Sequence, residues 1–285
     1  MYMRLEPLNI TWALQAVLPA LDFVLPGLLP GSLGLLVAPG GTGKSFLALD
    51  ISISQAIGRP VAGGLFPSLN PSRVVYLAGE ESDRLLAERL RCMLDLREQG
   101  LPTLQNLLLL PMSGEDCLLV SRGQPTTLLD ELENLAQGAR LIIVDPIRRL
   151  HDGDENDSAA MTQLVIALES LAKKTGAAVI GIHHANRASV GDTGSQHASR
   201  GSSALVDGAR WQINLSKMDE KAAAFYGKGD EERHNYVALD YAKGNYLSAS
   251  PRSWLQRHAG GALKLVTLDK SQPKGKTLGG ARLIP

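Results

Sequence analysis

The sequence contains little cysteine and no excess of charge of either sign. Only two of its 285 residues are cysteines, Cys92 and Cys117, and their spacing matches neither a disulfide framework nor a metal-ligand set. Lysines and arginines number 29, as do aspartates and glutamates, so the formal net charge is zero. The scarcity of cysteine excludes a disulfide-stapled scaffold and fits a reducing compartment, and we expect a cytoplasmic protein. Because the net charge is zero, overall charge cannot attract a polyanion, and a partner of that kind would have to bind a local basic patch.

A continuous membrane-spanning run is lacking as well. The long apolar stretch at residues 18–37 is interrupted by charged or helix-breaking residues, namely Pro19, Asp22, Pro26 and Pro30. No positively charged flank resembles the start of a signal peptide. We therefore expect no membrane partner and no targeting segment. We interpret the stretch at residues 18–37 as a capping strand and turns over the edge of the core, and residues 1–30 as an N-terminal capping and subunit-contact segment.

Short apolar runs alternate with runs of helical spacing along most of the chain. The apolar runs predict buried strands at residues 33–40, 72–81, 106–112, 139–147 and 177–185. The other runs predict helices at residues 45–58, 82–97, 126–138 and 160–176. Continuous apolar strands separated by helices are typical of a parallel sheet, because both faces of such a sheet are covered. We therefore expect an α/β fold with a mostly parallel twisted sheet flanked by helices.

The pattern changes after residue 205. Residues 205–218, 234–246 and 260–268 are predicted to form short strands and turns, which we expect to add antiparallel strands at the C-terminal edge of the sheet. Residues 269–285 are basic and rich in glycine and proline, so we expect a flexible tail. Residues 31–268 are enough for one large domain, and no internal repeat divides them.

Residues 38–45, APGGTGKS, lie between the first predicted strand and the first predicted helix. They match the phosphate-loop pattern G-x-x-x-x-G-K-[ST], except that Ala38 replaces the first glycine. The intervening residues can still curl so that backbone N–H groups point inward at a phosphate chain; they are Pro39, Gly40, Gly41, Thr42 and Gly43. Lys44 would then contact the β- and γ-phosphates of ATP, and Ser45 would ligate Mg²⁺. The alternative is a glycine-rich turn without a binding function. The strand before the loop and the helix after it favour nucleotide binding.

Acidic residues follow two of the predicted strands. Asp145 ends the run LIIVD, and we expect its carboxylate to hold the magnesium at the carboxyl edge of the sheet. Pro146 follows it instead of a glutamate, so the catalytic base must come from elsewhere. Glu80 and Glu81 end VVYLAGEE, and we expect Glu80 to orient the attacking water. The alternative is that Glu80 and Glu81 only stabilise the N-terminus of the following helix, where acidic side chains are favourable.

A base on the strand after the first helix resembles the arrangement of the RecA/DnaB class of ATPases. Further segments narrow the match, in the order APGGTGKS, VVYLAGEES, LIIVDPIRRLHDGDENDS, GIHHANR, QHASRGSSALVDGARWQ and YAKGNY. Together they resemble the RepA-type hexameric replicative DNA helicases of broad-host-range plasmids, over about residues 8–265. The block HASRGSSALVDGARW is the most specific part. The resemblance implies a RecA-like ATPase and helicase domain at residues 31–268, with residues 1–30 also contacting a neighbouring subunit.

The resemblance also implies roles for residues outside the phosphate loop. Arg210 matches the arginine finger that one subunit inserts toward the γ-phosphate of the next, and Lys243 is a weaker candidate of the same kind; an ordinary strand arginine is the alternative. His183 and His184 end the fifth strand at the sensor position. Adjacent strand residues point to opposite faces, which argues against a metal pair, and we prefer His184 as the sensor. Arg89 is a possible phosphate contact, with an exposed helix arginine as the plainer alternative.

Residues 186–203 form a long predicted loop rich in glycine and serine. In a ring of RecA folds such a loop faces the channel, where it could hold single-stranded DNA by its phosphate backbone, and Arg187, Arg200 and Ser202 are the candidate contacts. Residues 148–160 would be the other channel loop, but their acidity counts against a DNA grip. Neither loop carries an aromatic stacking platform, so we expect binding without sequence preference.

These expectations define an ATP-driven replicative helicase that acts as a ring-shaped homohexamer on single-stranded DNA during plasmid or mobile-element replication. No primase or DNA-reading domain is visible in the sequence, so separate primase and initiator proteins are the expected partners. Two alternatives remain open. One is a RecA-like recombination protein that binds DNA without unwinding it, and the other is a regulatory or accessory ATPase that binds no DNA.

Overall fold

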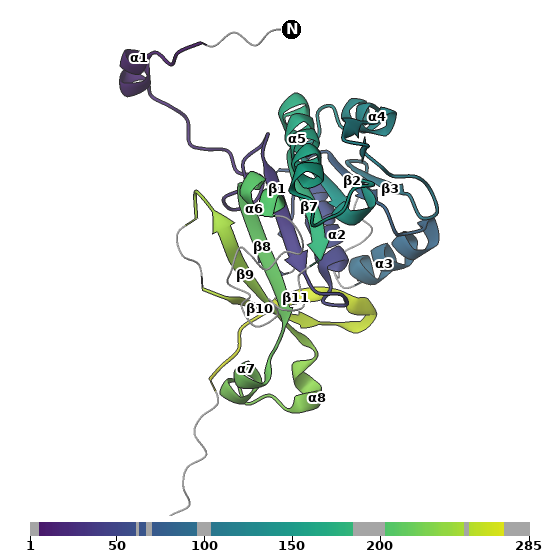
Figure 1. Ribbon diagram of the computed structural model, residues 1–285. Coiled ribbons are helices and arrows are strands. Elements are labelled where there is room, and N and C mark those ends of the chain that lie inside the picture. The colour runs from purple at the N-terminus through teal and green to yellow at the C-terminus, as the bar shows by residue number, and fades with distance from the viewer. Residues whose placement is uncertain are drawn as a thin grey trace, which may run out of the picture.

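A nine-stranded mixed sheet forms the centre of the molecule, in the order β11-β10-β9-β8-β1-β7-β6-β2-β3 (Figure 1). The computed structural model describes residues 6–60, 63–66, 70–95, 104–184, 203–247 and 251–270. The strands are β1 Leu33–Ala38, β2 Val74–Ala78, β3 Leu107–Pro111, β6 Leu141–Asp145, β7 Ala178–His184, β8 Trp211–Lys217, β9 Tyr236–Gly244, β10 Ser253–Arg257 and β11 Leu263–Val266. The run from β8 to β3 is parallel, and β9, β10 and β11 are antiparallel additions at one edge. The predicted fold class is confirmed.

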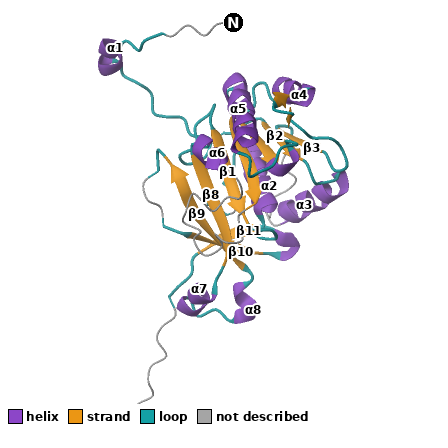
Figure 2. Cartoon of the chain, in the orientation of Figure 1, coloured by secondary structure: helices purple, strands orange, loops and turns teal. Residues whose placement is uncertain are grey.

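Helices cover both faces of this sheet (Figure 2). One face carries α2 Lys44–Ile57 and α3 Asp83–Asp95, and the other carries α4 Thr127–Leu135, α5 Ser158–Thr175 and α6 Ser203–Gly208. Alternate residues of the central strands enter the two cores, because successive strand side chains point to opposite faces. In β2, for example, Val74 and Tyr76 pack under α2, whereas Val75 and Leu77 pack under α4 and α5.

The smaller elements lie outside these layers. They are α1 Ile10–Gln15, α7 Glu220–Phe225, α8 Asp230–Arg233, the 3-10 turns Ile147–Arg149 and Ala259–Gly261, and the two-stranded ribbon of β4 Val120–Ser121 and β5 Gln124–Pro125. No helix within the described ranges is long and apolar enough to cross a membrane.

The segment after residue 202 differs from its prediction. We predicted only strands and turns at residues 205–218, but its first part belongs to helix α6, and β8 pairs in parallel with β1. Gly208 allows α6 to pack closely on α5, because a Cβ at this position would lie 2.4 Å from Val165. The antiparallel additions therefore begin one strand later, at β9.

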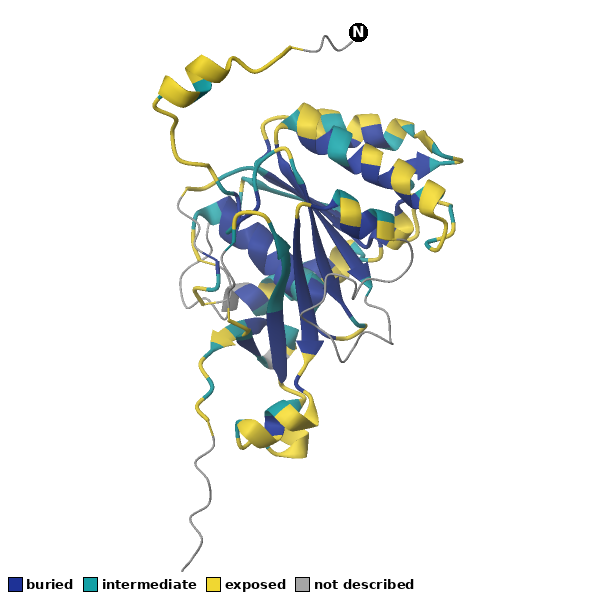
Figure 3. Cartoon of the chain, turned by 60° about the vertical axis from the view of Figure 1, so that its left-hand side comes forward, coloured by how far each residue is buried: buried dark blue, intermediate teal, exposed yellow. Residues whose placement is uncertain are grey.

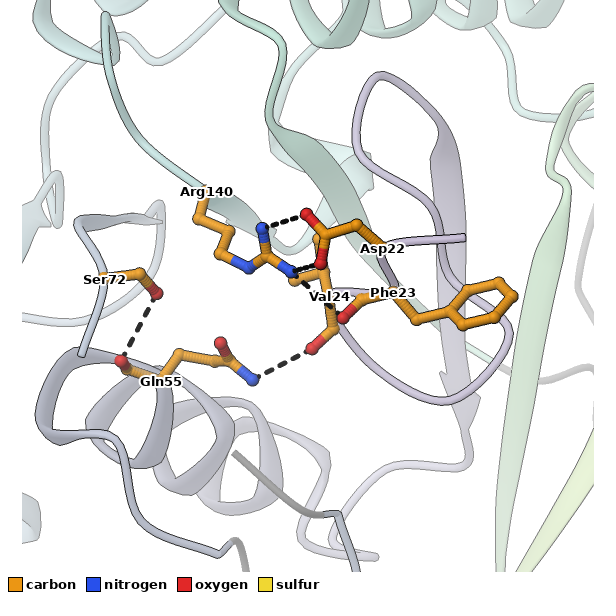
Figure 4. A network of polar contacts seen from close by, with 6 residues as sticks. All are labelled: Asp22, Phe23, Val24, Gln55, Ser72 and Arg140. Atoms are coloured by element: carbon orange, nitrogen blue, oxygen red, sulfur yellow. Dashed lines mark hydrogen bonds and ion pairs between the residues drawn. The ribbon is translucent and has the colours of Figure 1, made fainter. Parts of the chain in front are cut away.

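The chain before β1 is tied to the sheet at residues 22–28. Arg140 forms an ion pair with Asp22, with Nη1 2.7 Å from Oδ2, and also donates to the carbonyl of Phe23 (Figure 4). Gln55 at the end of α2 donates to the carbonyl of Val24 over 3.0 Å. By contrast, α1 buries none of its residues and stands away from the body (Figure 3).

Candidate nucleotide site

The loop between β1 and α2 has the backbone shape of a phosphate cradle. Gly41 and Gly43 have φ angles of 68° and 105°, in the left-handed region that favours glycine. Helix α2 begins directly at Lys44 with Gly43 as its N-cap and no side-chain cap, so its first N–H groups remain available to an anion. Ala38 is the last, fully buried residue of β1. The replacement of the first motif glycine therefore falls on a regular strand position.

Two basic side chains from different elements meet beside this loop. Lys44 is only 8% exposed, and its Nζ lies 3.4 Å from Nδ1 of His184 at the end of β7. Burial lowers the pKa of Lys44, while the carboxylates of Asp145 and Glu80 oppose that shift. Burial and then the charge of Lys44 lower the pKa of His184. A lysine stripped of water in this way gains strongly from an anionic ligand.

Asp145 lies on the same face of the sheet as Lys44 and is also buried, at 6% exposure. The hydroxyl of Tyr76 donates to its Oδ2 over 2.7 Å. Burial, followed by the nearby Asp145 carboxylate, raises the pKa of Tyr76 well above its ordinary value, so Tyr76 remains a donor. Asp145 and the Ser45 hydroxyl supply hard oxygen ligands of the kind that Mg²⁺ takes, and the residues fit this ion.

This fit does not depend on a dedicated metal cage. Among the described residues no group of three or more His, Cys, Asp or Glu side chains could hold a metal ion. Mg²⁺ in nucleotide sites commonly uses one or two protein oxygens together with phosphate oxygens and water. Ser45 and Asp145 are sufficient for that mode.

The two glutamates after β2 have different surroundings. Glu81 forms an ion pair with Arg89 of α3, with Oε1 2.6 Å from Nη2, and the same guanidinium lies 5.0 Å from the ring centre of Phe46. Burial raises the pKa of Glu81, and Arg89 acts in the opposite direction. Glu80 is exposed, and its charge acts on Lys44 and His184. The geometry therefore favours Glu80 over Glu81 as the group that can contact a water molecule. Arg89 is engaged in the ion pair with Glu81.

Sequence reasoning missed Arg257, which holds the phosphate loop from the antiparallel edge. Its Nη2 donates to the carbonyl of Thr42 over 2.9 Å and to that of Gly41 over 3.3 Å. Gly43 in turn packs on β11, where an added Cβ would lie 3.1 Å from Leu263. No local signal could have found Arg257, because 215 residues separate it from Thr42 and no motif surrounds it.

Arg210 and Lys243 lie together at the opposite edge of the sheet. The backbone N–H of Arg210 donates to the carbonyl of Leu33, the first residue of β1, whereas the phosphate loop leaves the last residue of β1. The strand between them is six residues long, about 20 Å. Lys243 pairs with Gln212 in the neighbouring strand, and the charge of Arg210 contributes to the lowering of its pKa, after burial. Arg210 therefore cannot reach the cradle of its own chain, and the Nζ of Lys243 is directed to α6, where it donates to the carbonyl of Val206 over 2.6 Å.

The proposed DNA contacts cannot be placed in this way. Arg187, Arg200 and Ser202 lie outside the described residues, as does the loop predicted at residues 186–203 except for Ser203, the first residue of α6. Their assignment stays a prediction.

A parallel sheet with a phosphate cradle at its carboxyl edge, and with Asp145 and Glu80 beside it, defines a P-loop ATPase domain of RecA-like fold. The chain belongs to the AAA domain family AAA_25, whose sequence profile matches residues 3–190. It is also similar in fold to the crystal structure of the RadB recombinase, with a TM-score of 0.56 and 17% sequence identity. That similarity covers 85% of this chain and 93% of the recombinase chain.

Proposed function

We propose that this protein is an ATP-dependent replicative DNA helicase that works as a ring-shaped homohexamer on single-stranded DNA. The observation that carries the proposal is the placement of Arg210 at the sheet edge opposite to Lys44. An exposed arginine in that position can meet a phosphate chain only in another subunit. Repetition of this head-to-tail contact closes into a ring when the rotation allows it.

The chain's own residues divide the work at each subunit contact. Lys44 and the N-terminus of α2 would bind the phosphates of ATP, while Ser45 and Asp145 would hold Mg²⁺, an ion that would supply charge neutralisation to the phosphate chain. Glu80 orients the attacking water. Arg210 of the adjacent subunit stabilises the charge of the transition state, with Lys243 beside it. Hydrolysis is then tied to assembly, because neither subunit carries a complete site.

His184 supplies the connection to DNA in this proposal. It contacts Lys44 and is the last described residue before the predicted loop that contains Arg187, Arg200 and Ser202. A change at the γ-phosphate that moves Lys44 therefore acts directly on the root of this loop. The loop would hold the DNA backbone in the central channel, and separate initiator and primase proteins would load the ring and prime synthesis.

The N-terminal segment offers a second subunit contact. Residues 8–21 leave many large apolar side chains in water, namely Leu8, Ile10, Trp12, Leu14, Val17, Leu18 and Leu21. An exposed apolar arm of this kind is characteristic of a surface that is covered in an assembly. This favours an oligomer over an independent monomer.

A RecA-like DNA-dependent ATPase that forms a filament in recombination is the second candidate. Its support is the shared fold with the RadB recombinase. The same head-to-tail contact produces a filament when the rotation does not close. A regulatory ATPase without DNA remains the third possibility.

Three measurements on the purified protein separate these candidates. A helicase displaces a strand from a forked duplex with ATP, and its ATPase rate rises with single-stranded DNA and falls on dilution. Negative-stain images then show closed rings. DNA-stimulated hydrolysis with filaments and no strand displacement supports the recombination candidate, and hydrolysis indifferent to DNA supports the regulatory one. The Lys44→Ala variant is the control for a contaminating ATPase.

A further inference from the structure

Tyr76 is the buried neighbour of Asp145, the carboxylate proposed above to hold Mg²⁺. It is 1% exposed, lies in the middle of β2, and donates its hydroxyl proton to Oδ2 of Asp145. We propose that Tyr76 is a positioning residue, which fixes the Asp145 carboxylate in the orientation that serves the Mg²⁺ of the bound nucleotide. The inference rests on the nucleotide site proposed above and gives a role to a strand residue four positions before Glu80.

The register of the sheet explains why these two side chains meet. Strands β2 and β6 are parallel neighbours in which Tyr76 pairs with Ile143 and Ala78 pairs with Asp145. Tyr76 and Asp145 therefore point to the same face, two residues apart along the strand direction. The length of a tyrosine side chain spans this diagonal. A phenylalanine would fill the same space but could not reach the carboxylate with a polar atom.

The ring of Tyr76 is a rigid support. It is packed in the core between the sheet and α2, the helix that begins with Lys44. A ring held on all sides keeps its hydroxyl in place, whereas a water molecule in that position could move. With Oδ2 engaged by Tyr76, Oδ1 is the carboxylate oxygen left for a cation or its water. Groups that hydrogen-bond a ligating carboxylate commonly change metal affinity by about 10- to 100-fold when removed.

The test compares Tyr76→Phe with Tyr241→Phe in the full-length protein. Tyr241 is a matched control, because it lies in the same sheet with its ring against Phe66 and Trp211 and takes no part in the cradle. A fluorescent N-methylanthraniloyl derivative of ADP is bound first in EDTA and then during a Mg²⁺ titration. We expect Tyr76→Phe to bind nucleotide normally in EDTA and to need about tenfold more Mg²⁺ for half-maximal tightening. Tyr241→Phe should match the wild type in both conditions.

An unchanged Mg²⁺ midpoint in Tyr76→Phe would overturn the inference, and so would an equal shift in both variants, which would show a general effect of core packing. These results leave the proposed function intact, because the wild type still binds nucleotide and responds to Mg²⁺. A wild type that binds no nucleotide would overturn the proposed function together with the inference.

A second measurement does not depend on the phenylalanine variant folding. 3-Fluorotyrosine is placed at position 76 alone, or at position 241 alone, and its ¹⁹F resonance is followed. Addition of Mg²⁺ to the ADP-bound protein should shift the resonance at 76 and leave that at 241 in place. A resonance at 76 that does not respond contradicts the positioning role.

Discussion

The side chains of Lys44 and His184 meet at the carboxyl edge of the sheet, with Nζ 3.4 Å from Nδ1. The register places Ala38 beside His184, so the phosphate loop begins next to the last residue of β7. His183 points to the other face and is buried. The preference for His184, reasoned from strand alternation, therefore agrees with this geometry, although its role as a sensor is still a proposal.

The first prediction concerns His184. His184→Ala removes the side chain proposed to connect Lys44 to the predicted DNA-binding loop, so the stimulation of ATPase activity by single-stranded DNA should fall about tenfold, while nucleotide binding is kept. Asn places a polar atom close to the position of Nδ1, and His184→Asn should recover part of the stimulation. Full DNA stimulation in the alanine variant would contradict the sensor role.

The second prediction separates the two glutamates after β2. Glu80→Gln should lower the turnover rate by about a hundredfold or more and leave ATP binding unchanged, because the base is lost but the cradle is not. Glu81→Gln weakens the ion pair with Arg89 and should have a smaller effect on turnover. Steady-state ATPase rates and equilibrium nucleotide binding of both variants provide the measurement. The reverse order of effects would assign the base to Glu81.

The third prediction concerns the shared site. Arg210→Ala should bind ATP but hydrolyse it about a thousandfold more slowly, and Lys44→Ala should also be inactive. A mixture of the two variants should regain activity, because a mixed ring contains contacts with an intact Lys44 on one side and an intact Arg210 on the other. The rate is measured as a function of mixing ratio. Normal turnover of Arg210→Ala alone, or a mixture that stays inactive, would count against a site completed in trans.

The fourth prediction uses pH and stability. His151 is 3% exposed, and neither of its buried ring nitrogens forms a well-aligned hydrogen bond among the described residues. Burial lowers its pKa below the ordinary value of 6.5, as does Arg148, whereas Glu155, Asp152 and the backbone of Gly153 act in the opposite direction. The unfolded chain therefore binds the proton more readily, and the free energy of unfolding falls as the pH drops below about 6.5 toward the folded pKa.

The variant His151→Phe tests this dependence, because it keeps a ring and cannot be protonated. Its free energy of unfolding by urea should fall less between pH 7.5 and about pH 5 than that of the wild type, by about 1.4 kcal/mol for each unit of pKa separation. His234→Gln, at an exposed histidine, is the control and should follow the wild type. Parallel curves for His151→Phe and the wild type would contradict the assignment.

Much of the fold could be predicted, because the signals for strands and helices are local. The apolar run before Ala38 and the glycines after it determine β1 and the loop without reference to the rest of the chain. Helix α6 was missed because six residues are too few to show a helical period, and its position depends on the fit of Gly208 against Val165. Arg257 and Tyr76 were missed for a related reason, since their partners are distant in sequence and only the sheet order brings them together.

The sequence by itself determined the alternation of buried strands and helices and the phosphate loop, since hydrophobic periodicity and glycine backbone freedom act over a few residues. Only the tertiary structure decided that Glu81 is paired while Glu80 is exposed, that Tyr76 holds Asp145, and that Arg210 lies across the sheet from Lys44. The physical reason is that contacts between distant residues follow from strand order and register, and no short stretch of sequence contains that information.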